Sequence, residues 1–222
     1  MSKESSRRED TTGSTHTDQG ALTREGVEIS RQSRMMAREM VGNKNADDRI
    51  RQRCSVAVGD FSMADLLRFS HNPLPAGIGA LARESPIITD IRMVQVGIQK
   101  KGHHSPLLCA LDFGSDIAFS RGITRTSAGF LSLRDKITDA IVVIGNAPSA
   151  LLSLCAMVEE GVKPALIIGT PVGFVNARES KELLRTLPIP SISTEGTRGG
   201  TPVAVAAMNE IIEIFCEESH GH

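Results

Sequence analysis

Continuous apolar runs in the middle of the chain predict short buried strands. Three such runs occupy residues 106–111, 140–144 and 165–168. They lack the alternation of apolar and polar residues, which indicates strands that are covered on both faces, as in parallel sheets. A further strand is expected at 86–89, ending at Asp90.

Between and around these runs, apolar residues recur at the spacing of a helix. The predicted helices cover residues 27–41, 46–57, 62–67, 78–84, 149–160, 176–187 and 202–215. The stretch His71–Gly77, with two prolines, is expected to break the chain between two of them. Strands alternating with helices favour an α/β fold, a three-layer sandwich with a mainly parallel central sheet.

The beginning of the chain differs from the rest in composition. Residues 1–20 contain no apolar residue beyond Met1 and are rich in Ser, Thr and charged residues. Such a segment cannot bury enough apolar surface to offset the entropy lost on ordering. We therefore expect a disordered polar tail over 1–20 and a single α/β domain over 21–218, a length that can bury one core.

Composition and charge exclude several classes of function. The net charge is −1 and the chain has no Trp or Tyr, which disfavours nucleic-acid binding. No run of about 18 apolar residues is present, so no membrane span is expected. The cysteines lie far apart and form no metal-binding pair, which indicates reduced thiols in a cytoplasmic protein; they are Cys54, Cys109, Cys155 and Cys216.

Four loops of the predicted fold could hold a ligand. Residues 144–152, 169–176 and 195–207 each join a strand to a helix or precede a helix, and 121–129 is a Thr/Ser-rich loop with two arginines. The first N–H groups of a helix are unpaired, and both helix N-termini and guanidinium groups suit carboxylates or phosphates. An anionic ligand is therefore expected.

The residues of these loops also have a simpler interpretation. Gly145 allows a tight turn, Asn146, Asn176 and Thr201 are candidate helix caps, and Pro148 suits a first helical turn. Each loop alone could be a well-capped helix start, but four loops with arginine at two of them favour a shared site. None matches a Walker A loop or a Gly-x-Gly-x-x-Gly motif, so a nucleotide is not indicated.

Several stretches resemble a known family when they are taken in order. GITRTSAG, VIGNAPSALL, IIGTPVGFVNARESKELL and RGGTPVAVAAMNEI are similar to signature segments of the precorrin-8X methylmutases, also called cobalt-precorrin-8 methylmutases. The segment TDIRMVQVG resembles the family's Asp-x-x-Met stretch. The resemblance implies a homodimeric α/β isomerase of cobalamin biosynthesis without metal or organic cofactor. Its members move a methyl group from C11 to C12 of an acid-rich tetrapyrrole.

The resemblance also implies which residues line the tetrapyrrole pocket. Arg125 is expected to contact substrate carboxylates or the ring, and the Arg198 region is expected to act as an anion clamp. Asp90 would orient an arginine or a substrate amide, or cap a helix. The full set of expected substrate-binding residues is Asp90, Met93, Thr124, Arg125, Ser127, Asn146, Pro148, Gly173, Phe174, Arg198, Gly199 and Gly200.

The chain departs from the family at the position of the general acid. The family carries a histidine before an Asp-Phe pair, and alignment backward from Asp60-Phe61 places Val56 there. Replacement donors are weak: a serine or an unperturbed thiol donates poorly at neutral pH. The histidines are expected to be exposed to solvent, and none is expected to hydrogen-bond beside Val56. The residues considered as replacement proton donors are Cys54, Ser55, His71, His103 and His104.

Two functions follow from these residues, with a third kept for comparison. The first is a methylmutase with an altered proton source. The second is a catalytically impaired relative that binds a corrinoid or related tetrapyrrole without turnover. An unrelated α/β enzyme for small phosphorylated substrates is supported by fold class alone. Whether the substrate carries a metal is left open by the sequence.

Overall fold

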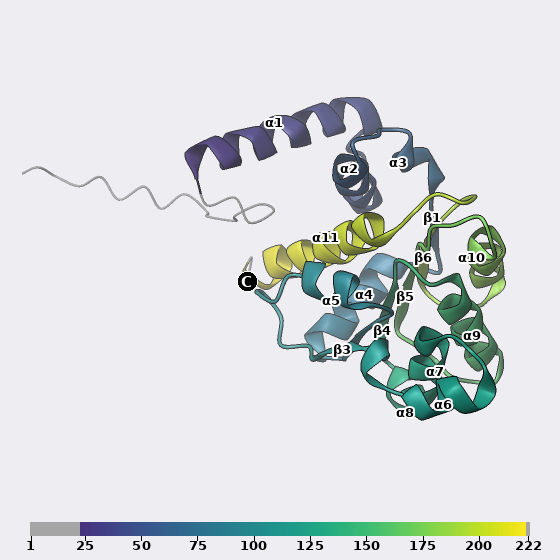
Figure 1. Cartoon of the computed structure of the whole chain (residues 1–222). Helices are drawn as coiled ribbons and strands as arrows, with labels where there is room; N and C mark the ends of the chain where they lie inside the picture. Colours follow the sequence, from purple (N-terminus) through teal and green to yellow (C-terminus); the bar gives the residue numbers. More distant parts are fainter. Residues whose placement is uncertain (1–22, 221–222) are drawn as a thin grey trace, which may run out of the picture.

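The computed structural model describes residues 23–220, so the expected tail over 1–20 lies outside the described part of the chain. A six-stranded sheet in the order β1-β6-β5-β4-β2-β3 forms its centre (Figure 1). Only β1 runs antiparallel to its neighbour, and the other four pairings are parallel. The strands are β1 (Leu67–Ser70), β2 (Ile87–Thr89), β3 (Leu107–Cys109), β4 (Ile141–Ile144), β5 (Leu166–Gly169) and β6 (Ser191–Thr194).

Helices cover both faces of this sheet (Figure 1). They are α1 (Arg24–Val41), α2 (Ala46–Val58), α3 (Met63–Leu66), α4 (Pro73–Ala82), α5 (Arg92–Gly97), α6 (Ser115–Arg121), α7 (Arg125–Ser132), α8 (Arg134–Ile137), α9 (Pro148–Glu159), α10 (Ala177–Thr186) and α11 (Thr201–His220). None of the helices in the described part of the chain is long and apolar enough to cross a membrane.

Alternate residues of the strands belong to two separate apolar cores. Ile141 and Val143 of β4 face a core built from α2, α4, α5 and α11. Val142 and Ile144 face a second core built from α7, α8, α9 and α10. Because side chains alternate across a strand, a strand with both faces covered is apolar throughout. The predicted α/β architecture with a mainly parallel sheet is therefore confirmed.

Several elements differ from the prediction. The polar strand β6 and the edge strand β1 were not expected, and neither were the short helices α5, α6, α7 and α8. The stretch His71–Gly77 does not break a helix, because Pro73 occupies the first turn of α4, where proline is tolerated. The predicted helix at 62–67 ends at Leu66, and the chain then enters β1.

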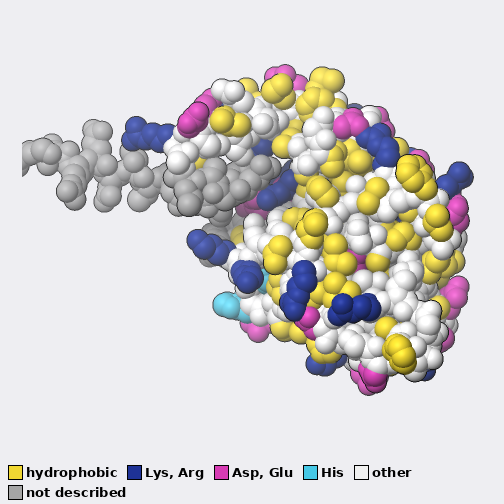
Figure 2. Space-filling view, in the orientation of Figure 1, with side chains coloured by type: hydrophobic (Ala, Val, Ile, Leu, Met, Phe, Trp, Pro, Cys, Tyr) yellow, Lys and Arg dark blue, Asp and Glu magenta, His cyan; other side chains and the backbone are white. Residues whose placement is uncertain are grey.

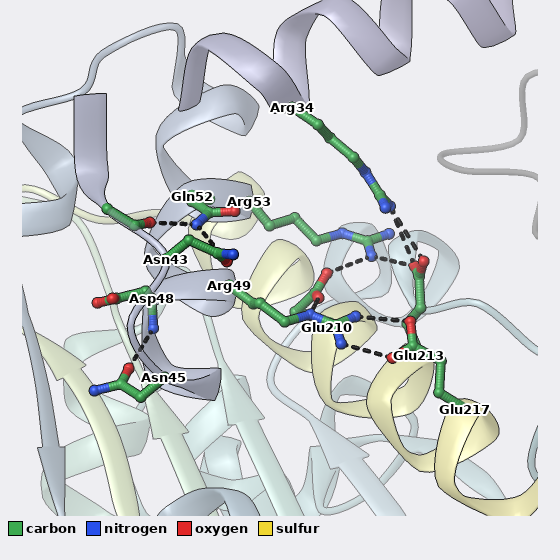
Figure 3. A network of polar contacts seen from close by, with 11 residues as sticks. Arg34, Asn43, Asn45, Asp48, Arg49, Gln52, Arg53, Glu210, Glu213 and Glu217 are labelled. Carbon is green, nitrogen blue, oxygen red and sulfur yellow. Dashed lines mark hydrogen bonds and ion pairs between the residues drawn. The ribbon is translucent and has the colours of Figure 1, made fainter. Parts of the chain in front are cut away.

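A network of charged side chains fastens α1 and α2 to α11 (Figure 3). Arg53 of α2 is buried and donates to Glu210 at 2.9 Å and to Glu213 at 2.7 Å. Arg34 of α1 reaches the same Glu213 at 3.2 Å, and Arg49 bonds to Glu210 at 2.8 Å. These contacts position the end of α2, from which the chain leads toward the candidate site.

Candidate functional site

The loops that follow the parallel strands meet at one edge of the sheet. Residues after β2, β4, β5 and β6 all emerge at the carboxyl ends of adjacent strands, because these strands share one direction. In open α/β sheets this edge is the usual place for a ligand. The predicted residues of those loops are therefore brought to the same side of the molecule; they are Asp90, Met93, Asn146, Pro148, Gly173, Phe174, Arg198, Gly199 and Gly200.

Asp90 organises the loop between β4 and α9. Its buried carboxylate accepts N–H bonds from Asn146 and Ala147 at 2.7 and 2.9 Å, from Gly145 at 3.3 Å, and from Ile91 at 2.9 Å. Burial raises the pKa of the Asp90 carboxyl, although these four donors act in the opposite direction. The Asp90 carboxylate therefore accepts hydrogen bonds from backbone N–H groups. These bonds take the place of the arginine or substrate amide that was one expectation from the sequence.

The loop held by Asp90 differs in detail from the prediction. Asn146 does not cap α9, because Ala147 occupies the N-cap position and Asn146 is exposed. Pro148 stands in the first turn of α9, as expected. Gly145 is required by close packing, since a Cβ there would lie 2.9 Å from Cα of Thr201 in α11.

The expected loop at 121–129 is largely the start of helix α7. Thr124 is its N-cap, and the Thr124 hydroxyl accepts the N–H of Ser127 at 3.2 Å. The same hydroxyl lies 2.9 Å from Oγ of Ser149 and so joins the N-termini of α7 and α9. Arg125 is exposed and donates to the carbonyl oxygen of Leu111, which follows β3. Thr124, Arg125 and Ser127 therefore also lie at this edge.

The loop between β5 and α10 presents apolar side chains to solvent. Phe174 is 96% exposed and its neighbour Val175 is 76% exposed. Gly173 donates its N–H to the carbonyl oxygen of Thr197 at 3.1 Å, which ties this loop to the one after β6. Phe174 thus stands on open surface rather than in an enclosed cavity.

The loop after β6 carries Arg198, Gly199 and Gly200. The Arg198 guanidinium bonds to the carboxylate of Asp60 and to the Ser62 hydroxyl, just beyond α2. Hydrogen bonds from Ser62, together with this guanidinium, hold the pKa of Asp60 below its ordinary value. A Cβ at Gly199 would lie 2.3 Å from the carbonyl oxygen of Thr170, so only glycine fits there.

Exposed apolar residues surround this edge. Met93 and Val96 of α5 are 64% and 73% exposed, and Phe119 of α6 is 93% exposed. Figure 2 shows hydrophobic side chains along α1 and over the centre of the face of the molecule that is in view. Large exposed apolar groups beside arginines suit a ligand with a flat apolar ring and acidic substituents.

Two of the proposed replacement donors are buried beside Val56. The Sγ of Cys54 donates to the carbonyl oxygen of Val203, and burial raises the pKa of this thiol to about 12. Ser55 is fully buried as well. Neither side chain is exposed to a ligand at the edge, so neither is placed to donate a proton there.

His71, His103 and His104 lie at the opposite edge of the sheet. His71 follows β1, which runs antiparallel to the other strands and therefore ends at their amino-terminal side. His103 and His104 precede β3 and lie on that side as well. His71 and His104 are exposed, as expected, but His103 is buried and its Nε2 lies 2.9 Å from the Gln99 carbonyl oxygen.

Comparison with known proteins identifies the family. Residues 28–214 match the family model described as precorrin-8X methylmutase. A cobalt-precorrin-8 methylmutase from Methanocaldococcus jannaschii is 42% identical over 205 residues, covering 87% of this chain and 96% of the relative. A precorrin-8X methylmutase from Pseudomonas aeruginosa is 37% identical over 198 residues, covering 85% of this chain and 95% of the relative.

Solved structures agree with these sequence matches. The precorrin-8X methylmutase from Thermus thermophilus superimposes with a TM-score of 0.80 at 31% identity, covering 86% of this chain and 97% of that one. A structure described as a precorrin-8X methylmutase related protein gives a TM-score of 0.74 at 32% identity, covering 82% of this chain and 99% of that one. The chain therefore belongs to the precorrin-8X methylmutase family.

Proposed function

We propose that the chain binds precorrin-8 or cobalt-precorrin-8 at the carboxyl edge of its sheet and moves a methyl group from C11 to C12. The observation that carries the proposal is the convergence of the loops after β2, β4, β5 and β6, all within the family-matched region, at one edge. The Arg125 and Arg198 guanidinium groups and the joined starts of α7 and α9 are suited to the carboxylates of such a substrate.

The exposed apolar residues support the same proposal. Phe174, Met93 and Phe119 offer apolar area for the faces of a macrocycle. The proposed site is open on one side in a single chain. We propose that a second copy covers it, in a cytoplasmic homodimer.

A second candidate function is corrinoid binding without turnover. Val56 occupies the position expected for the general acid, and His71, His103 and His104 lie at the far edge of the sheet. A positioned acid typically contributes about 10²–10⁴ in rate. On this alternative the pocket is kept and the methyl shift is very slow.

One experiment tests both candidates. Purified protein is mixed with precorrin-8 or with cobalt-precorrin-8, and retention of the pigment and the spectral change of methyl migration are followed separately. We expect retention and conversion with at least one of the two forms. Retention without conversion identifies the second candidate, and absence of retention for both forms contradicts the proposed site.

Arg125→Ala provides the matched test of the binding residues. It should weaken retention by about 1.5–3 kcal/mol, the cost of losing a charged hydrogen bond. Arg83→Ala, between α4 and β2 at the opposite edge of the sheet, also removes an exposed guanidinium and is the control. Equal affinities of the two variants would remove Arg125 from the proposed site.

A further inference from the structure

Lys181 is a fully buried lysine beneath the loop that carries Arg198. Its side chain extends from α10, and Nζ donates to the carbonyl oxygen of Arg198 at 2.7 Å and to Oγ1 of Thr194 at 3.0 Å. The Thr194 hydroxyl in turn donates to the same Arg198 oxygen at 2.7 Å. One backbone carbonyl therefore accepts two short hydrogen bonds from side chains under it.

Burial of the Lys181 ammonium group costs folding free energy. Within residues 23–220, no carboxylate forms an ion pair with Lys181. A buried charge without a counter-ion lowers stability, and an apolar side chain of the same length would fill the space at lower cost. The presence of lysine at this position is therefore explained best by its hydrogen bond to the Arg198 carbonyl oxygen.

The carbonyl held by Lys181 belongs to a loop that is fixed at two further places. Gly200 donates its N–H to the Thr170 carbonyl oxygen at 2.7 Å, and the Gly173 N–H bonds to Thr197 at 3.1 Å. On the outer side of the loop, the Arg198 guanidinium extends to Asp60. Lys181 therefore fixes the backbone of Arg198, whose guanidinium belongs to the proposed site.

We propose that Lys181 is a positioning residue for ligand binding: its ammonium group anchors the Arg198 carbonyl, so that the Arg198 guanidinium and the start of α11 are held toward the anionic macrocycle. This inference rests on the proposed function. Lys181 itself does not reach the ligand surface, because Arg198 and Thr194 lie over it.

The charged groups around Lys181 predict a pH dependence. Burial lowers its pKa to about 8, and the Arg185 charge acts in the same direction. Strands β5 and β6 carry no charged residue. The remaining charges on neighbouring elements are Glu195 with its partner Arg68, Arg198 with Asp60, Arg178 with Glu182, Glu179 on α10, and Glu159 at the end of α9.

Loss of the proton above pH 8 should weaken ligand binding in two ways. The neutral amine is a poorer donor to the Arg198 carbonyl, and the positive charge below the anion site disappears. The affinity of the wild-type protein for cobalt-precorrin-8 should therefore fall as the pH rises from about 7 to about 9, near the lowered pKa.

The test compares Lys181→Met with Lys163→Met, which changes an exposed lysine at the opposite edge of the sheet. Lys181→Met should bind cobalt-precorrin-8 about tenfold more weakly at pH 7 and lose the affinity step near pH 8. Its thermal unfolding midpoint should be equal to or above that of the wild type, because a buried charge has been removed. Unchanged affinity, or a step that persists in this variant, would overturn the proposal.

A second measurement does not need the ligand. Hydrogen exchange of residues 195–203, corrected for the intrinsic effect of pH, should be slow in the wild type and faster in Lys181→Met. Thr194→Val, which removes the second donor and leaves the charge, should give a smaller increase. If the wild type binds no corrinoid, the proposed function fails, whereas equal exchange in all three proteins refutes the anchoring by Lys181.

Discussion

At the scale of single residues, Val56 occupies the position at which the family resemblance implies a general acid. It lies in the last turn of α2, four residues before Asp60, which binds the guanidinium of Arg198. The side chain at 56 is partly buried, whereas that of Ala57 is exposed. The end of α2 also carries the negative pole of the helix, which favours a protonated imidazole.

Val56→His should therefore accelerate methyl migration. A positioned general acid contributes about 10²–10⁴ in rate, and single-turnover absorbance with cobalt-precorrin-8 measures that change. Ala57→His adds the same imidazole at the adjacent exposed position and should have little effect. A Val56→His protein no faster than the wild type would show that protonation at this position does not limit the reaction.

The sequence revealed only part of the residue chemistry. Loop signatures led to the prediction of Arg125, Asn146 and Arg198 as ligand contacts, because glycine, proline and arginine at strand ends have recognisable patterns. Lys181 could not be found in this way, since a lysine on an amphipathic helix usually faces solvent. Lys181 is buried because the Arg198 loop folds over α10. This contact joins residues that are 17 positions apart in the sequence.

At the scale of elements, strand β6 was not predicted because its sequence lacks the pattern of a buried strand. Its residues Ser191–Thr194 are all buried, but they are mostly small and polar and show no apolar run. Strands β4 and β5 were predicted because their residues are apolar on both faces. The hydroxyl groups of β6 instead serve local contacts, such as Arg185 with Ser193 at 3.2 Å and Lys181 with Thr194.

Helix α1 exposes an apolar stripe that supports the proposed homodimer. Ile29, Met36 and Met40 recur at positions that share one face of the helix, and they are 58%, 55% and 67% exposed. Ser30 and Ala37, on another face, are the buried residues of α1. A stripe of this kind on a helix that extends from the body (Figure 1) suits a contact with a second copy.

Met40→Lys should weaken self-association. Burial of a Met side chain is worth about 1.5–3 kcal/mol, so its replacement by a charge should raise the dimer dissociation constant about tenfold or more. Light scattering across a dilution series measures the change. Ser132→Lys adds the same charge at an exposed site on α7 and should leave association unchanged. Equal dissociation constants would place the interface elsewhere.

At the scale of the whole molecule, stability and the site are connected through the charged network between α2 and α11. Arg53 links Glu210 and Glu213 of α11 to α2, and α2 ends at the segment that carries Asp60. The α11 helix also begins directly after the Arg198 loop. Loosening this network should therefore disturb both the core contact of α11 and the position of Asp60 at the edge.

The network predicts a loss of stability in acid. Burial opposes ionisation of Glu213, but the hydrogen bond from Arg53 and the charges of Arg34 and Arg53 outweigh it, so its pKa lies below the ordinary value. For a carboxyl with a lowered folded-state pKa, the contribution is complete above the unfolded pKa of about 4.3 and is lost as pH falls through the folded value. Asp90, whose pKa is raised, contributes with the opposite sign.

Denaturant unfolding at pH 7 and at lower pH measures this contribution. Glu213→Gln should lower the free energy of unfolding by about 1–3 kcal/mol at pH 7, because Arg53 loses one of its two carboxylate partners. The deficit should shrink as pH falls below about 4, since the wild-type carboxylate is then protonated as well. Asp116→Asn, at an exposed position on α6, should leave the free energy of unfolding unchanged both at pH 7 and at lower pH. A deficit that stays constant from pH 7 to pH 3 would mean that Glu213 acts through packing and that its charge has no part in holding α2 to α11.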